Sequence, residues 1–339
     1  MKNIFTLVCL ILATIIGAGF ASGKEIVVFF TNYGLISFLT ITLSFFLFYF
    51  SVKLFLNYSK TFNTKNIFEV NKQLFGKFSA IFNLFFMFSY CIVLAGMYAG
   101  IYEVYLTIFN ETISKIFTIF TVFIVVFVLI GGLNRISNFN NIFIPLTILL
   151  LIISAILSLK NTNFNINFNS VSNTINALIS SFNYVGINML LASSILLTVG
   201  KDYTKKQIKI SSIISCLILV LLIFLFNFVL INQTKLSDLP MATISGNINK
   251  LWGIVVLICI WFAIFSSILS VSYTIVSVVK ISIKCELVSA IITSAFGYVF
   301  SLFGFNKIVE FFYPLIGVLG IFLIIIVFIK SINQTTMQT

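Results

Sequence analysis

Charged residues are few in this sequence, and histidine is absent. Only 8% of its 339 residues are charged, and it contains no histidine. A soluble globule of this length needs far more polar side chains to cover its surface. Eight carboxylates, with no close acidic pair and no histidine, also offer little for metal or acid–base chemistry. The composition therefore excludes a soluble protein and argues against an enzyme with its own metal or cofactor.

Cysteine is also scarce, and the basic residues are dispersed. The five cysteines form no Cys-x-x-Cys pair and lie in or beside apolar runs, so we expect buried thiols. The net charge of +12 comes from basic residues scattered in short loops and not from a continuous basic stripe. We therefore expect no nucleic-acid partner, and the sequence indicates no protein partner.

Long apolar runs are what the sequence has instead. Hydrophobic residues make up 60% of the chain, and the mean hydropathy is +1.17. The runs recur from end to end and are about 20 residues long, enough for a helix to cross a bilayer. They are apolar on every face, whereas a membrane β-barrel shows short alternating segments. The sequence therefore predicts an all-α integral membrane protein with the lipid bilayer as its solvent.

Polar breaks divide these runs into ten expected transmembrane helices. The first run imitates a secretory signal peptide, but it continues to Phe30 and is expected to remain as a span. With both termini in the cytoplasm, the inner loops and ends hold 14 basic residues and the outer loops 5, with Lys24 inside a span. The expected spans are 4–33, 35–57, 78–108, 112–132, 138–158, 174–199, 207–231, 251–279, 286–304 and 308–329.

The spans form two halves of similar length within one transmembrane domain, residues 1–339. The first half ends near 158, so a first repeat covers about 1–158, and the second covers about 174–330. Because each half has an odd number of spans, a second repeat must be inverted relative to the first. This inverted five-helix arrangement is typical of secondary transporters.

Glycines interrupt the first span near its middle, at Gly17, Gly19 and Gly23. Each is costly in a regular helix, by about 1 kcal/mol relative to alanine. The alternative explanation is close helix packing through small residues. The first span of the second half is also interrupted, by polar residues and a glycine over 180–188. We therefore expect helices 1 and 6 to be broken, as at the midplane site of a transporter.

Broken helices leave unpaired backbone groups that lipid cannot satisfy but a ligand can. Free amides favour a carboxylate, and free carbonyls favour a cation such as sodium. Tyr90 and Tyr98 of the third span are added as candidates by their depth. The candidate substrate-binding residues are Gly17, Ala18, Gly19, Phe20, Tyr90, Tyr98, Tyr184, Gly186 and Asn188.

The run from Gly17 to Glu25, GAGFASGKE, resembles the opening signature of the bacterial YkvI-like membrane proteins. These form a branch of the amino acid–polyamine–organocation superfamily, and members often have glutamine where this sequence has Lys24. The resemblance implies the leucine-transporter fold, amino acids or amines as substrates, and sodium or protons as coupling ions. It also implies a site for sodium whose ligands are the carbonyl oxygens of Ala13, Ile16 and Ala263 and the hydroxyls of Ser266 and Ser267. Uncharged oxygen ligands suit a monovalent cation, although serines in membrane helices also bond back to their own backbone.

Charges inside a span are costly enough to be functional candidates. Lys24 and Glu25 follow the break, and Glu310 lies near the outer end of the last span, where similar transporters have the acidic member of a gate pair. One hypothesis is that Lys24 and Glu310 pair to close the outer vestibule. The alternatives are a local Lys24–Glu25 pair or a lysine that extends toward the interface. Glu25 is also a candidate to carry the proton of a proton-coupled carrier, whereas Glu103 is expected at the interface.

Taken together, the sequence predicts a multi-pass protein of a bacterial inner membrane. The expected function is secondary active transport, by sodium- or proton-coupled symport, of a small amino acid, amine or related solute. A ligand receptor on the same fold, such as the membrane subunit of a germinant receptor, and a channel remain alternatives. Short lid helices are possible in the outer segments 161–169 and 237–249.

Overall fold

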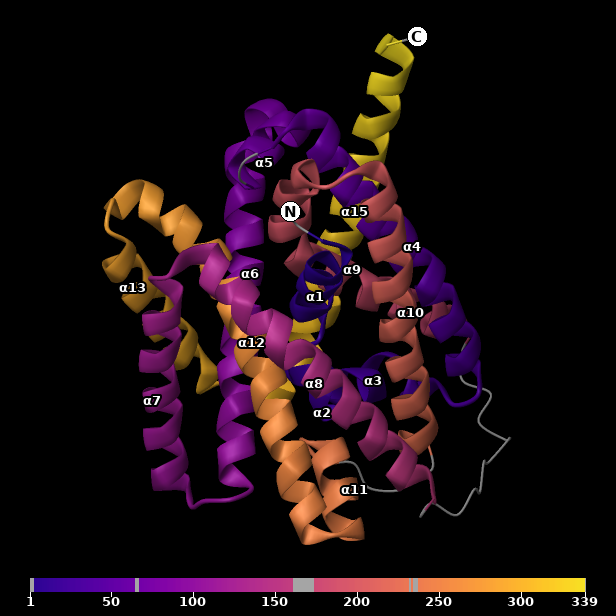
Figure 1. Ribbon diagram of the computed structural model, residues 1–339, viewed down its shortest axis with the longest axis vertical. Coiled ribbons are helices and arrows are strands. Elements are labelled where there is room, and N and C mark those ends of the chain that lie inside the picture. The colour runs from indigo at the N-terminus through magenta and orange to yellow at the C-terminus, as the bar shows by residue number, and fades with distance from the viewer. Residues whose placement is uncertain (1–2, 65–66, 161–173, 232, 234–236, 339) are drawn as a thin grey trace.

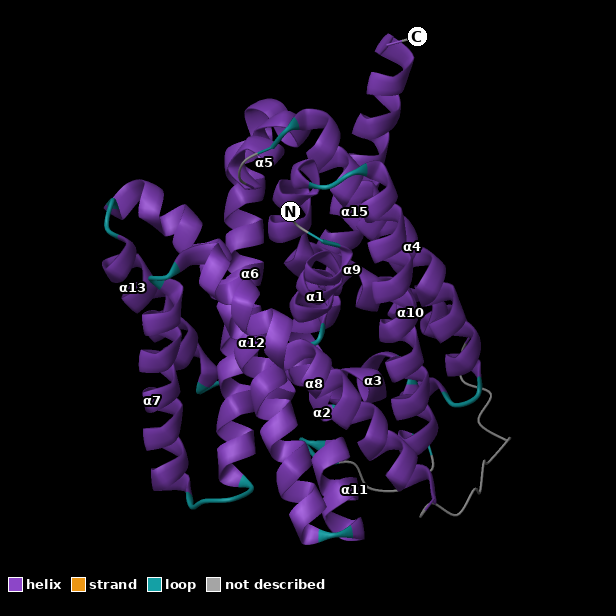
Figure 2. Ribbon diagram, in the orientation of Figure 1, coloured by secondary structure: helices purple, strands orange, loops and turns teal. Residues whose placement is uncertain are grey.

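Helices make up the whole of the regular structure in the part of the chain that the computed structural model describes, which is residues 3–64, 67–160, 174–231, 233 and 237–338 (Figure 2). In chain order they are α1 Ile4–Ile15, α2 Ala18–Ser22, α3 Lys24–Phe29, η1 Thr31–Tyr33, α4 Ile36–Phe62, α5 Ile67–Phe75, η2 Gly76–Phe78, α6 Ser79–Leu106, α7 Glu111–Leu129, α8 Gly132–Lys160, α9 Thr174–Val199, η3 Gly200–Asp202, α10 Lys205–Leu230, α11 Pro240–Ile248, α12 Lys250–Ile283, α13 Glu286–Ser301, α14 Phe305–Lys307, η4 Ile308–Phe312 and α15 Tyr313–Gln338. The prediction of an all-α membrane protein is confirmed.

The helices account for all ten expected spans. Within the described ranges, eight helices are long and apolar enough to cross a bilayer. The other two spans are the interrupted first segment and the shorter apolar helix α13. In Figure 1 the end of α15 reaches the top of the view, and the start of α1 lies inside the bundle in the upper half.

Several boundaries differ from the sequence-based expectation. α8 begins at Gly132, six residues before the expected start, because Gly132 has a positive φ of 66° at which the chain turns directly from α7 into the next helix. The segment after α4 contains α5, a short amphipathic helix that the sequence prediction treated as a loop. A short helix within 237–249 is confirmed as α11, which packs against the start of α12 at the lower end of the bundle (Figure 1). The segment 161–169 lies outside the described residues.

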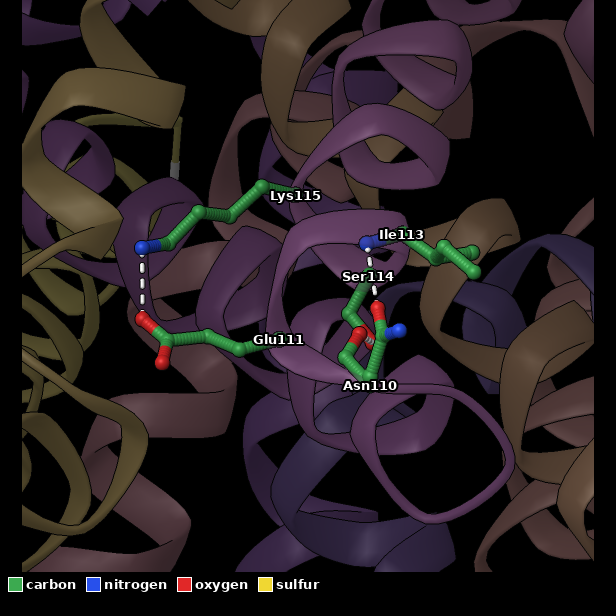
Figure 3. Close-up of polar contacts among 5 residues, drawn as sticks. All are labelled: Asn110, Glu111, Ile113, Ser114 and Lys115. Atoms are coloured by element: carbon green, nitrogen blue, oxygen red, sulfur yellow. Dashed lines mark hydrogen bonds and ion pairs between the residues drawn. The ribbon is translucent and has the colours of Figure 1, made fainter.

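A helix cap and a local ion pair account for the polar residues at the start of α7. Asn110 Oδ1 accepts a hydrogen bond from Ile113 N at 3.0 Å, and Ser114 Oγ donates to the Asn110 carbonyl oxygen at 2.9 Å (Figure 3). Lys115 Nζ lies 2.6 Å from Glu111 Oε1, one turn away on the same exposed surface. These contacts fix the start of the helix, so the Glu111–Lys115 pair needs no other role.

The centre of the bundle is α9, most of whose side chains are buried. It packs along α15 on one side and α4 on the other. The approach to α15 is close because small residues meet there. A Cβ on Gly320 would lie 1.8 Å from the carbonyl oxygen of Gly186, and a Cβ on Gly186 would lie 2.1 Å from that of Gly317. Glycine is therefore required at this crossing by direct backbone contact.

The prediction that the sixth span is broken is wrong. α9 runs without interruption from Thr174 to Val199. Asn188 Nδ2 donates to the Tyr184 carbonyl oxygen at 2.9 Å within the same helix, so this polar side chain is satisfied without a break. Gly186 serves the contact with α15. The polar and glycine positions that resembled a break therefore reflect local bonding and packing.

Candidate functional site

The first span is interrupted where the glycines predict. α1 ends at Ile15, and Gly17 adopts an extended conformation with φ −108° and ψ −160° before α2 begins. A second interruption lies at Gly23, whose φ of 85° is in the left-handed region that favours glycine. The break in helix 1 is confirmed, and the segment has three short helices in place of one span.

The first interruption frees backbone carbonyls. The Gly17 amide, which would bond the Ala13 carbonyl in a continuous helix, donates to the Ile15 carbonyl at 2.9 Å. The hydroxyl of Ser267 on α12 takes the place of the Gly17 amide at the Ala13 carbonyl. Ser267 Oγ lies 2.8 Å from the Ile16 carbonyl oxygen and 3.1 Å from the Ala13 carbonyl oxygen. A side chain 251 residues away thus satisfies the end of α1.

The remaining residues of the expected oxygen set lie on the same helix as Ser267. Ser266 Oγ donates to the Ala263 carbonyl oxygen at 3.3 Å, and all three residues are fully buried. The structure therefore joins Ala13, Ile16 and Ser267 by hydrogen bonds and holds Ala263 and Ser266 beside them along α12. Uncharged oxygens gathered at a helix break fit a monovalent cation, and sodium binding here stays a prediction.

Lys24 and Glu310 form the expected ion pair. Lys24 Nζ lies 2.8 Å from Glu310 Oε1 and joins the outer half of the first span to the start of the last. Glu310 sits in a single π-helical turn, Ile308–Phe312, which precedes α15. Such turns insert one extra residue and often occur at functional positions. The local Lys24–Glu25 pair is not what the structure shows, while closure of a vestibule by this pair stays a hypothesis.

The two members of this pair differ in exposure, which predicts an unequal mutational response. The Lys24 side chain is 10% exposed and that of Glu310 56%. We expect Glu310→Gln to lower the melting temperature more than the double variant Lys24→Gln/Glu310→Gln, because the single variant leaves a buried charge unpaired. With one partner half exposed, the expected difference is about 1 kcal/mol. Thermal unfolding in detergent at low and high salt measures it.

The exposed Glu111–Lys115 pair provides the control for this experiment. Glu111→Gln is expected to leave the melting temperature almost unchanged, since the pair is a solvated i,i+4 pair on one helix. Equal melting temperatures for wild type, Glu310→Gln and the double variant would show that the Lys24–Glu310 pair does not stabilise the contact between the first and last spans.

Glu25 lies inside the protein, against the break. Only 6% of the residue is exposed, and its Oε2 has no hydrogen-bond partner among the described residues. A Cβ on Gly19 would lie 2.4 Å from Glu25 Cγ and Oε1, so the carboxylate folds back onto α2. Tyr184 packs on Phe29 and Phe30 at the end of α3, the short helix that contains Glu25. Glu25 and Tyr184 therefore share one buried region with the break.

The expected substrate residues divide into two groups. Gly17, Ala18, Gly19 and Phe20 form the break and the start of α2, and Tyr184 packs against the end of α3, which carries Glu25. The other four have different contacts in this structure.

Tyr98 and Tyr90 are not at the break, contrary to the expectation. Tyr98 packs on α13, where a Cβ on Gly297 would lie 2.9 Å from its ring. Tyr90 OH lies 3.0 Å from the Leu190 carbonyl oxygen and 2.9 Å from Ser193 Oγ, so it ties α6 to the second half of α9. Both rings instead hold helices together. Gly186 and Asn188 likewise serve packing and bonding of α9, as described above.

A different face of α6 lies against the break, and sequence reasoning missed it. A Cβ on Gly100 would lie 2.9 Å from Ala18 Cβ, and a Cβ on Gly17 would lie 3.4 Å from Met97 Cε. Gly96, one turn away, approaches Tyr313 OH, where a Cβ would lie 3.1 Å away. The signal was present as the Gly96-xxx-Gly100 spacing, which marks a close helix approach.

Comparisons with known proteins agree with this architecture. Residues 3–297 match the family model described as spore germination protein, or spore permease. The chain is 26% identical to the uncharacterized membrane protein YkvI of Bacillus subtilis (strain 168) over 314 residues, which cover 90% of this chain and 89% of YkvI. It is also 26% identical to the uncharacterized protein YyaD of the same strain over 328 residues, 93% of each chain.

Solved structures share the fold. MhsT, in complex with L-phenylalanine, superposes with a TM-score of 0.74 at 14% identity over 94% of this chain and 87% of its own. Mhp1, a nucleobase-cation-symport-1 family transporter in a closed conformation with bromovinylhydantoin bound, gives a TM-score of 0.61 at 14% identity, over 93% of this chain and 75% of its own. The YkvI-like resemblance and the leucine-transporter fold are thereby confirmed. The chain belongs to the spore germination protein family of multi-pass membrane proteins.

Proposed function

We propose that this protein is a sodium-coupled secondary transporter for a small amino acid, amine or related organic solute. It works by alternating access as a single domain in the bacterial inner membrane, with both termini cytoplasmic. Its two five-helix repeats, about 1–158 and 174–330, move against each other around the break in the first span. The orientation follows from the excess of basic residues in the loops assigned to the inside.

The observation that carries the proposal is the position of Ser267 between the carbonyl oxygens of Ala13 and Ile16. Both carbonyls lie at the end of α1, before the break, and the hydroxyl lies on α12, so a cation bound there would hold α1 and α12 in one arrangement. Its release would free them to separate. Such a dependence of helix position on a bound ion is what coupling requires.

The Lys24–Glu310 pair supplies an outer closure in this proposal. It links the outer half of the first span to the last span. Lys24 is nearly buried, whereas Glu310 is half exposed, so the pair lies at the boundary between the interior and the outer solution. Breaking it would open a route from outside to the region of Glu25 and Tyr184, while the coupling ion keeps the inner side closed.

The test is uptake by proteoliposomes that contain the purified full chain. Labelled amino acids and amines are offered with an inward sodium gradient, an inward proton gradient or potassium alone. We expect accumulation above the outside concentration only with the sodium gradient. Accumulation driven by protons and abolished in Glu25→Gln would reject sodium coupling and assign the coupling to that carboxyl group. Equilibration without accumulation under every gradient would indicate a channel.

A second candidate function is favoured by the family match, since the matching model describes spore germination proteins. In that case the protein would be a ligand receptor that uses the same fold without moving its ligand across the membrane. Saturable binding of an amino acid or amine, with no uptake under any gradient, would support the receptor and reject the transporter.

A further inference from the structure

The buried carboxyl group of Glu25 has no positive partner among the described residues. An ionised carboxylate inside a membrane protein is costly unless it is paired. Its Oε2 is buried and accepts no hydrogen bond in the described parts of the chain. The neighbouring cation, Lys24, is directed to Glu310 at 2.8 Å. The protein therefore holds an acceptor of positive charge at its centre and pairs the adjacent lysine with another residue.

Aromatic rings cluster beside α3, the short helix that carries Glu25. Tyr184 is fully buried in this cluster. The rings of Phe29, Phe30 and Phe48 surround Tyr184, with centroids 5.4, 5.0 and 5.8 Å from its own. A carboxylate beside aromatic rings is the combination that recognises organic ammonium groups, by a charge-assisted hydrogen bond and by cation–π attraction.

The continuity of α9 removes the other acceptor that a broken helix would provide. In an unbroken helix the backbone carbonyls are engaged in intrahelical bonds, and the Tyr184 carbonyl oxygen also accepts from Asn188 Nδ2. An ammonium group at the centre of the protein thus finds its acceptor in Glu25 rather than in α9. The oxygens around Ser267 lie at the other interruption, beside Gly17. In the proposed function they bind the sodium ion.

We infer that Glu25 binds the ammonium group of the solute, with Tyr184 beside it. The substrate class is accordingly organic amines, amino acids included, and carboxylates that lack an amino group are rejected. The inference rests on the proposed function, because it names the solute that the proposed carrier takes.

The test compares matched triples in which one group is removed at a time. One triple is L-phenylalanine, phenethylamine and hydrocinnamate, and the others are L-leucine, isopentylamine and isocaproate, and L-alanine, ethylamine and propionate. Melting temperature of the full-length protein in detergent reports binding to the folded state. We expect the amino acid and the amine of at least one triple to raise it and no acid to do so. Glu25→Gln is expected to weaken amine binding at least about 30-fold, while Glu25→Asp, which keeps the charge, retains part of it.

Sodium serves as the internal control for this experiment. The sodium-dependent rise in melting temperature is expected to persist in Glu25→Gln, which shows that the variant is folded. The inference is overturned if an acid binds the wild type as its amine does, if Glu25→Gln keeps the wild-type affinity for the amine, or if no amine binds the wild type. The comparison of the triples on the wild type decides the matter even where the variant fails to fold. Amine binding without sodium-driven uptake would reject the transport proposal and leave the assignment of Glu25 standing.

Discussion

Ser267→Ala is expected to remove most of the sodium-dependent stabilisation and the sodium-driven uptake of this protein. The Ser267 hydroxyl on α12 meets the carbonyls of Ala13 and Ile16, which lie on the α1 side of the break. Without it a bound cation loses a ligand and the connection between α12 and the first span. A loss of at least about tenfold in sodium affinity corresponds to about 1.4 kcal/mol less stabilisation at saturating sodium. The difference in melting temperature between sodium and choline measures this directly.

The difference between the two salts separates the ion site from the hydrogen bonds. Ser267→Ala also removes a donor from two buried carbonyls, which lowers stability in either salt by about 1 kcal/mol or more. Ser277→Ala is the matched control on the same helix, since Ser277 Oγ donates only to the Thr274 carbonyl oxygen, 2.7 Å away, among the contacts described. We expect the control to keep the full sodium response. A full response in Ser267→Ala would reject the sodium site.

The break in the first span was predictable because its cause is local. Three glycines within seven residues are incompatible with a stable apolar helix, and the structure bends at Gly17 and Gly23. The partnership of Ser267 with this break was predictable only through family resemblance, since no local pattern links residues 251 positions apart. The Lys24–Glu310 pair was predictable as a hypothesis for two reasons. A charge inside a span must be compensated, and the resemblance pointed to Glu310 as the acidic member of a gate pair.

The orientation of side chains around long apolar helices was not predictable. Tyr90, Tyr98 and Gly96 all belong to α6, and helix packing decides which of them faces the break. In a chain with 41 phenylalanines and 12 tyrosines, aromatic residues mark no particular face. The π-helical turn at Glu310 has no sequence signal of its own either, because it depends on how the last span meets the first.

Glycine has two meanings in a membrane helix, and Gly186 shows how sequence alone confuses them. It can weaken a helix, or it can let a neighbouring helix approach. At Gly17 the backbone leaves the helical conformation. At Gly186 the helix continues, and the neighbouring backbone of Gly317 takes the space of a side chain.

The largest effect on folding is therefore expected from Gly320→Ala. The new Cβ would lie 1.8 Å from the Gly186 carbonyl oxygen, a contact with backbone that no rotamer change relieves. α9 and α15 must move apart, and helix association in the membrane depends on such close packing. We expect a cost above about 3 kcal/mol, the upper end for overpacking. The yield of monodisperse protein in detergent and its melting temperature measure it, with Gly246→Ala, which meets open space, as the control.

Gly186→Ala decides between the two meanings. The new Cβ would lie 2.1 Å from the Gly317 carbonyl oxygen, so the packing interpretation predicts misfolding or a large drop in melting temperature, as for Gly320→Ala. A hinge at this position predicts the opposite, because alanine favours a continuous helix. The variant would then be at least as stable as wild type, and only uptake would fail. A stable but inactive Gly186→Ala protein would mean that α9 opens during transport, and that the unbroken helix is one state of a moving element.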